Sequence, residues 1–184
     1  MTKIVGLSGS LRRGSLNTTL LRAAARLMPE VTLEVADISE VPLYNGDVEK
    51  EQGIPAAVAR LKDLVATSDG LLIASPEYNQ GTPGVLKNAI DWMSRPADDI
   101  ARVFLKKPVA LIGATPGPWG TARAQPLLLP VLRALQMRTF FDTAPFYLPA
   151  AHKAFDADGE FIDALPRERL ENFLRAFIAF VRAQ

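Results

Sequence analysis

The stretch Gly9-Ser10-Leu11-Arg12-Arg13-Gly14-Ser15-Leu16-Asn17 joins a short apolar run, Ile4–Leu7, to a segment with helical periodicity. The apolar run is typical of a strand that is buried on both faces of a parallel sheet. After Asn17, apolar residues recur along one helical face: Leu20, Leu21, Ala24, Leu27 and Met28. The stretch is therefore the loop of a strand–loop–helix unit, the building block of an α/β fold.

The same alternation of strands and helices continues along the chain. Further strands are expected at Val31–Ala36, Leu71–Ala74 and Val109–Gly113, with a fifth within Arg138–Thr143. The expected class is therefore α/β, a doubly wound five-stranded parallel sheet with helices on both faces. We expect residues 1–184 to form one domain, because neither a linker nor an internal repeat interrupts the pattern.

Prolines mark the predicted helices. Pro55 and Pro166 each open or closely precede a helix, and Pro83 is expected to be the first residue of another, with Thr82 as its N-cap. The helix expected over Thr121–Gln136 should begin late or kink, because Pro126 and Pro130 remove backbone donors. The segments 42–54 and 94–107 are expected to be irregular.

Composition excludes several classes of function. The 184 residues include no cysteine and one histidine, and 21 Lys+Arg balance 20 Asp+Glu to a net charge of +1. Thiol chemistry, disulfides and cysteine-ligated metals are therefore excluded, and His152 lacks the partners of a hydrolytic triad. The Asp156–Glu160 segment predicts a β-turn rather than a calcium loop, so we expect no metal site.

The expected surroundings of the protein follow from the same data. The balanced charge predicts no binding to nucleic acid or to an anionic membrane. No apolar run approaches the roughly 18 residues that suggest a membrane span. The first residues lead directly into the first strand, which predicts a cytoplasmic protein without a signal peptide.

The first loop is rich in groups that bind anions. Ser10, Ser15, Asn17 and Thr18 can surround a phosphate at the helix N-terminus, with Arg12 over it. A polar turn that only caps the helix is the alternative, but one cap does not explain four donors. Neither a G-x-G-x-x-G fingerprint nor a Walker-type Gly-Lys-Ser/Thr motif is present.

The loops after the third and fourth strands are also unusual. Ser75–Gly84 contains two prolines and two glycines, and its Tyr78 offers an aromatic face to a flat ring. A structural turn before a helix explains this segment equally well. Ala114–Thr121 is similarly constrained, and its Trp119 can cover a ligand or pack at a subunit contact. In a doubly wound sheet, such loops gather where ligands bind.

These motifs together carry a family resemblance. The first loop, the Ser75-Pro76-Glu77-Tyr78-Asn79 segment and the Pro83–Trp92 segment resemble the NADPH-dependent FMN reductases, a family that includes chromate, quinone and azo-dye reductases. The likeness extends to Phe155–Gly159 and so covers nearly the whole chain. It implies a flavodoxin-like fold, non-covalently bound FMN and a homodimer or homotetramer.

The resemblance also assigns residues to the flavin. It implies that the first loop holds the FMN phosphate and that the second loop holds the isoalloxazine edge. The third loop departs from the family pattern at Pro118 and Trp119, and its flavin contacts are predicted at three residues that precede them. The predicted cofactor-binding residues are Ser10, Arg12, Ser15, Leu16, Asn17, Pro76, Glu77, Tyr78, Asn79, Thr115, Pro116 and Gly117.

The function that follows is an oxidoreductase with a ping-pong cycle. NADPH or NADH gives a hydride to FMN, and an acceptor such as a quinone, azo compound, chromate or free flavin then takes the electrons. No side chain is assigned as a catalytic acid or base. The alternative is a flavodoxin-like FMN electron carrier that does not oxidise nicotinamides, although such carriers are usually strongly acidic.

Overall fold

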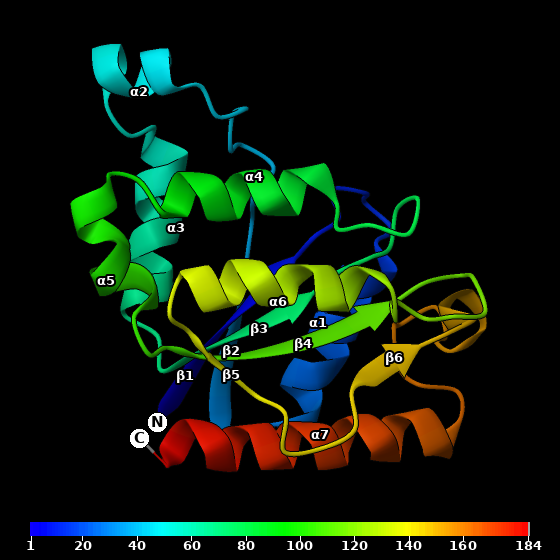
Figure 1. Ribbon diagram of the computed structural model, residues 1–184. Helices are drawn as coiled ribbons and strands as arrows, with labels where there is room; N and C mark the ends of the chain where they lie inside the picture. The colour runs from blue at the N-terminus through cyan, green and yellow to red at the C-terminus, as the bar shows by residue number, and fades with distance from the viewer. Residues whose placement is uncertain (184) are drawn as a thin grey trace.

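A parallel sheet forms the centre of the molecule in the computed structural model, which describes residues 1–183 (Figure 1). The strand order is β2-β1-β3-β4-β5, with β6 pairing with β4 off this path. This is the order of the flavodoxin-like fold, so the predicted fold class is confirmed. The strands span Thr2–Ser8 (β1), Val31–Ala36 (β2), Gly70–Ala74 (β3), Pro108–Ala114 (β4), Arg138–Thr139 (β5) and Phe146–Leu148 (β6).

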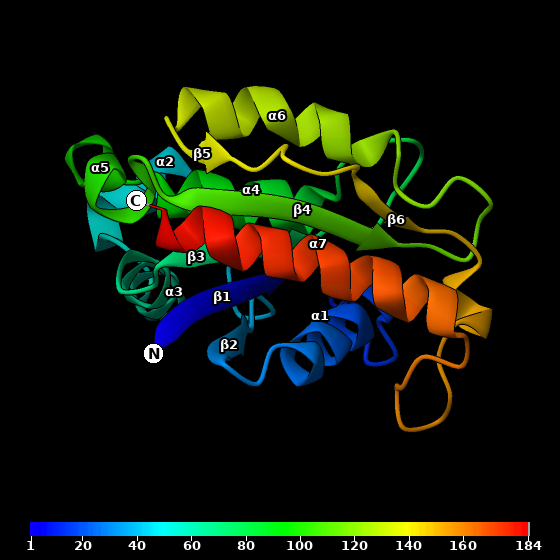
Figure 2. The ribbon, with the colours of Figure 1, turned by 90° about the horizontal axis from the view of Figure 1, so that it is seen from below.

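Helices cover both faces of the sheet, as a parallel sheet requires. Figure 1 shows α4 and α6 on one side and α7 on the other, and Figure 2 shows α1 beside α7. The α-helices span Leu16–Leu27 (α1), Gly46–Gln52 (α2), Ala56–Ala66 (α3), Gly84–Met93 (α4), Ile100–Phe104 (α5), Ala124–Ala134 (α6) and Ala164–Arg182 (α7). Short 3-10 helices lie at Ala97–Asp99 and Ala151–Lys153.

Alternate residues of the strands divide the core into two clusters. Ile4 and Leu72 belong to the cluster under α1 and α7, whereas Val5 and Leu71 belong to the cluster under α3, α4, α5 and α6. β1, β3 and β4 therefore bury both of their faces, which explains why their sequences read as continuous apolar runs.

The structure differs from the predicted elements at four places. The predicted fifth strand is split, because β5 pairs with the start of β4 and β6 pairs with its end, with residues 140–145 between them. The predicted irregular segments 42–54 and 94–107 contain α2 and α5. Pro83 rather than Thr82 is the N-cap of α4, because the Thr82 hydroxyl donates to Ala124 O, at 3.3 Å.

The late start of the fourth predicted helix is confirmed. Here α6 begins at Ala124, three residues beyond Thr121, so that Pro126 falls in its first turn, where a missing N–H costs little. Pro130 is accommodated inside the helix.

This topology brings three loops to one end of the sheet. The chain moves from β1 outward to β2 on one side, and through β3, β4 and the split edge strand on the other. The winding therefore reverses between β1 and β3, which is the switch point where such folds bind ligands. The loops that follow β1, β3 and β4 lie together at the right of Figure 1. None of the described helices is both long and apolar enough to cross a bilayer.

Candidate functional site

The loop after β1 prepares the N-terminus of α1 for an anion. Ser15 is the N-cap, and its hydroxyl oxygen accepts from the N–H of Thr18 at 3.2 Å. The N–H of Ser15 donates to Arg12 O at 3.1 Å, which closes the loop on itself. The first N–H groups of a helix, here those of Leu16 and Asn17, have no partner within the helix. They point along the helix dipole toward the place where an anion is stabilised.

Two of the predicted donors act elsewhere in the structure. The Asn17 side chain is buried, and its Nδ2 donates to Ala114 O at 2.9 Å while its Oδ1 accepts from Ala114 N at 3.0 Å. The Thr18 hydroxyl donates to the Ser8 hydroxyl at 2.9 Å. In this structure the side chains of Asn17 and Thr18 therefore make contacts within the protein, and the group of Asn17 that remains at the start of α1 is its backbone N–H.

The loop after β3 is a tight hairpin. Tyr78 and Gly81 exchange backbone hydrogen bonds of 3.1 and 2.9 Å. Between them, Asn79 and Gln80 have φ angles of 51° and 64°, the pattern of a type I′ turn. The hairpin presents Tyr78, 46% exposed, with its hydroxyl 3.4 Å from the Ser10 hydroxyl. It also places Asn79 at its tip.

Glu77 connects the second loop to the third. One oxygen of its carboxylate accepts from the backbone N–H groups of Arg123 and Ala124, at 2.9 and 3.1 Å. These groups open α6, so the negative charge of Glu77 stabilises the positive end of that helix. The role of Glu77 in the described structure is thus to cap a helix and to fix the position of the hairpin.

The loop after β4 is held by the segment that follows β6. The N–H of Thr115 donates to Leu148 O, and Gly117 O accepts from the N–H of Ala150, both at 3.1 Å. Beneath the loop, an added Cβ at Gly113 would lie 2.0 Å from the Thr121 hydroxyl oxygen. The side chain of Thr121 therefore occupies the space that only a glycine leaves open.

The two tryptophans lie in different surroundings. Trp92 is fully buried, with its indole N–H donating to Pro42 O at 2.9 Å, so it does not border the site. Trp119 is 64% exposed, and the Arg123 guanidinium lies 5.7 Å from its ring centroid.

The three loops enclose a hollow of about 90 Å³, which we call the loop hollow. Its lining contains ten of the twelve residues predicted to bind the cofactor. Asn79 and Gly117 are the two that do not line it, and Ala114 is the one lining residue that was not predicted. The lining residues are Ser10, Arg12, Ser15, Leu16, Asn17, Pro76, Glu77, Tyr78, Ala114, Thr115 and Pro116.

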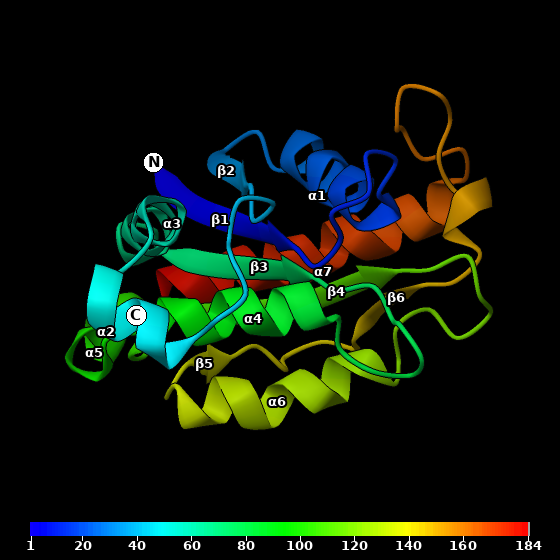
Figure 3. The same cartoon turned by 90° about the horizontal axis from the view of Figure 1, so that it is seen from above.

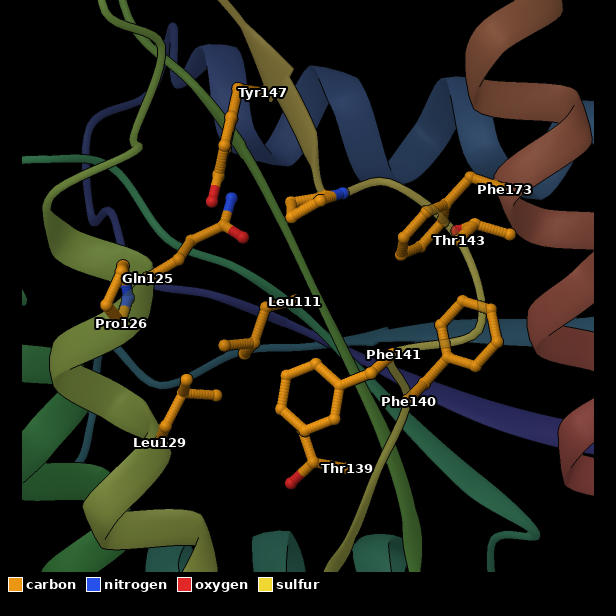
Figure 4. Close-up of a pocket in the computed structure, with 11 residues that line it drawn as sticks. Leu111, Gln125, Pro126, Leu129, Thr139, Phe140, Phe141, Thr143, Tyr147 and Phe173 are labelled. Carbon is orange, nitrogen blue, oxygen red and sulfur yellow. The ribbon is translucent and has the colours of Figure 1, made fainter.

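A second pocket, drawn in Figure 4, has a different character. It lies where the edge strand is interrupted, and its lining has no charged side chain. Figure 4 shows the polar ends of Tyr147 and Gln125 turned toward each other, with the rings of Phe140 and Phe141 at the opposite end. Burial raises the pKa of Tyr147, which keeps its hydroxyl neutral. This pocket offers a mostly apolar surface and no charged group that would bind a phosphate.

The other candidate segments lie away from the loop hollow. The backbone N–H of Asp156 donates to Glu160 O at 2.9 Å, and Gly159 has a φ of 77°, so this segment is the predicted turn. Among residues 1–183, no group of three or more His, Cys, Asp or Glu side chains is placed to hold a metal ion. His152 is exposed in a short 3-10 helix.

Comparison with known proteins identifies close relatives. The model of the NADPH-dependent FMN reductase family matches residues 2–149. An NAD(P)H-dependent FMN reductase of Pseudomonas aeruginosa is 44% identical over 98% of this chain and 95% of its own. A 2-hydroxy-1,4-benzoquinone reductase of a Burkholderia species is 38% identical over 98% of this chain and 96% of its own. The solved structure of FerB, a flavoenzyme NAD(P)H:(acceptor) oxidoreductase from Paracoccus denitrificans, superposes with a TM-score of 0.89 at 33% identity, covering 100% and 98% of the two chains.

Proposed function

The chain belongs to the NADPH-dependent FMN reductase family, and from that premise we propose that it is an FMN-dependent NAD(P)H oxidoreductase whose flavin lies in the loop hollow. FMN bound there would supply the chemistry of hydride transfer from NADPH or NADH and of two-electron transfer to an acceptor that occupies the same place. Quinones, azo compounds, chromate and free flavin are the acceptor classes that this chemistry allows. The observation that carries the proposal is the meeting of three loops around one anion-binding helix N-terminus.

The groups at the deep end of the hollow fit a phosphate. The N–H groups of Leu16 and Asn17 begin α1, the hydroxyls of Ser10 and Ser15 line the same space, and Arg12 borders it. Helix N-termini and arginines bind phosphates through charge-assisted hydrogen bonds. The loop hollow therefore holds the phosphate end of FMN.

The ring end of FMN has to lie outside this hollow. Small-molecule sites typically enclose about 300–1,000 Å³, and the loop hollow has about 90 Å³. The isoalloxazine ring therefore lies on the open rim, where Pro76 and the exposed face of Tyr78 border the hollow. Backbone N–H groups of these constrained loops orient the ring and stabilise negative charge on it. Glu77 does not act as a base here, because its carboxylate caps α6.

An open rim also favours assembly. Tyr78 and Trp119 are large aromatic side chains, 46% and 64% exposed, beside a site that binds a flat ring. We propose a homodimer or homotetramer in which a second subunit covers this rim, and a cytoplasmic location.

The experiment that tests the placement of FMN is a flavin titration. Arg12→Gln should weaken FMN binding about tenfold or more, the loss expected for a hydrogen bond to a charged group. Arg133→Gln is the matched control, because Arg133 is an exposed arginine in the last turn of α6, at the opposite end of the sheet. Equal FMN affinities of the two variants would show that the FMN phosphate does not bind at this loop.

A further inference from the structure

A larger groove lies on the other side of the first loop, between α1 and the end of β2, which lie side by side at one edge of the sheet (Figure 3). Its volume is about 390 Å³, within the range of small-molecule sites. We call it the basic groove, because three arginines dominate its polar lining. The polar residues that matter are Ser10, Arg12, Arg13, Arg22, Asp37 and Ser39.

The arginines of the basic groove are unusual in having no partner. Across residues 1–183, the guanidinium groups of five arginines form no hydrogen bond, ion pair or aromatic contact, and three of these five share this groove. The five are Arg12, Arg13, Arg22, Arg133 and Arg167. Three arginines without an ion-pair partner in one groove give it an excess of positive charge, which attracts a ligand with a compact negative charge, such as a phosphate.

Two other arginines, Arg95 and Arg123, have partners within the protein. The Arg95 Nε donates to both oxygens of Glu49, at 3.0 and 2.9 Å. The Arg123 guanidinium lies over the ring of Trp119. Unlike Arg95 and Arg123, Arg13 has a guanidinium group without a partner and lines a groove.

A fixed carboxylate lies opposite the arginines. The two oxygens of Asp37 accept from the backbone N–H and the hydroxyl of Ser39, at 2.8 and 2.9 Å. The first of these bonds is the main reason that the pKa of Asp37 is lowered, so this side chain stays charged. Each oxygen keeps a lone pair for another donor. Asp37 follows the second strand of the sheet, where dinucleotide folds place either an acid for the ribose 2′-hydroxyl or an arginine for a 2′-phosphate. With three arginines beside it, Asp37 is left to accept from the 3′-hydroxyl of a 2′-phosphorylated ribose.

The basic groove adjoins the loop hollow. Ser10 and Arg12 line both spaces, and the Ser10 hydroxyl lies 3.4 Å from that of Tyr78 at the rim. A dinucleotide that places its nicotinamide on the ring side of Tyr78 can therefore extend past Ser10 into the basic groove.

We propose that the basic groove binds the 2′-phosphorylated adenosine end of NADPH, with Arg13 and Arg22 on the phosphate and Asp37 on a ribose hydroxyl. This inference rests on the proposed function and deepens it, because it makes the chain select NADPH over NADH. Both arginine side chains are exposed, so their replacement leaves the core intact.

The test uses ligands that differ only in the phosphate. Adenosine 2′,5′-bisphosphate and adenosine 5′-monophosphate are titrated by calorimetry into the wild type, the double variant Arg13→Gln/Arg22→Gln, and the control Arg133→Gln. The wild type and the control should prefer the bisphosphate. The double variant should lose about ten- to a hundredfold in affinity for it, as expected for charge-assisted hydrogen bonds. The ratio of kcat/KM for NADPH to that for NADH should fall by a similar factor.

The outcomes separate this inference from the proposed function. Equal affinity of the wild type for the two nucleotides, or an unchanged NADPH preference in the double variant, would overturn the assignment of the groove even if FMN is bound and reduced. Retention of FMN after desalting, measured by absorbance on the same samples, tests the proposed function independently of the groove.

Discussion

Asn17 and Ala114 form two hydrogen bonds that join the start of α1 to the end of β4. Nδ2 of Asn17 donates to Ala114 O at 2.9 Å, and Ala114 N donates to Asn17 Oδ1 at 3.0 Å. Both residues are buried. The amide side chain thereby links the loop after β1 to the loop after β4, and it sets the spacing between them.

Asn17→Ala should therefore affect both stability and cofactor binding. The substitution leaves the N–H and C=O of Ala114 without their partner in a buried place, which costs about 2–4 kcal/mol of the free energy of unfolding. FMN affinity should fall as well, because the two loops lose their connection. Chemical denaturation and flavin titration measure the two effects. Asn172→Ala, on the exposed side of α7, is the control and should change stability by no more than about 0.5 kcal/mol.

Glu77 should prove to be a helix cap rather than a proton-transfer group. Glu77→Ala should lower the free energy of unfolding by about 1 kcal/mol, the usual loss when a cap is removed. Glu77→Gln retains an acceptor oxygen, and turnover in this variant should stay within about tenfold of the wild type with the same pH profile. A loss of about 10²–10⁴ in turnover, typical of a missing general acid or base, would show that this assignment is wrong.

The packing beneath the third loop predicts a steric effect at Gly113. A Cβ there lies 2.0 Å from the Thr121 hydroxyl oxygen and 2.6 Å from Ser75 O. Gly113→Ala should therefore destabilise the protein by about 2 kcal/mol or more, because a backbone has to move. Gly14→Ala adds the same methyl group where no atom lies within 4 Å, and its stability should change by less than about 1 kcal/mol. Melting curves of the two variants make the comparison, and similar melting temperatures would contradict it.

Tyr78 should contribute to turnover more than to folding. Its ring is 46% exposed, so Tyr78→Ala removes little buried area. An aromatic contact with the flavin is worth about 0.5–1.5 kcal/mol, so kcat/KM or the preference among acceptors should change about two- to tenfold. Tyr78→Phe keeps the ring and should behave like the wild type. Unchanged kinetics in Tyr78→Ala would remove this residue from the site.

Local sequence signals predicted most of the fold and the anion site of the first loop, whereas the family resemblance supplied most of the residues that line the loop hollow. Apolar runs such as Ile4–Leu7 identify buried parallel strands because both faces are covered, and hydroxyls next to a helix start identify an anion site. The split of the edge strand into β5 and β6 was not predictable, because a short strand paired on one side leaves a weak pattern in the sequence.

Roles that depend on tertiary contacts were also missed. The sequence places Asn17 at the loop after β1 and Glu77 in the loop after β3. It does not show that their side chains form hydrogen bonds with Ala114 and with the start of α6. Arg22 was overlooked as well. A helical signal was present, since Arg22 follows Thr18 by four residues and so lies on the same face of α1.

An anaerobic absorption spectrum tests most directly whether the protein binds FMN and reduces it with NADPH. The protein is reconstituted with FMN, desalted, and mixed with NADPH in the absence of oxygen. Flavin absorbance should be retained after desalting and should bleach when NADPH is added. Bound flavin that stays oxidised with both NADPH and NADH would contradict the proposed function in favour of an electron carrier, and a protein that retains no flavin would contradict the assignment of the loop hollow itself.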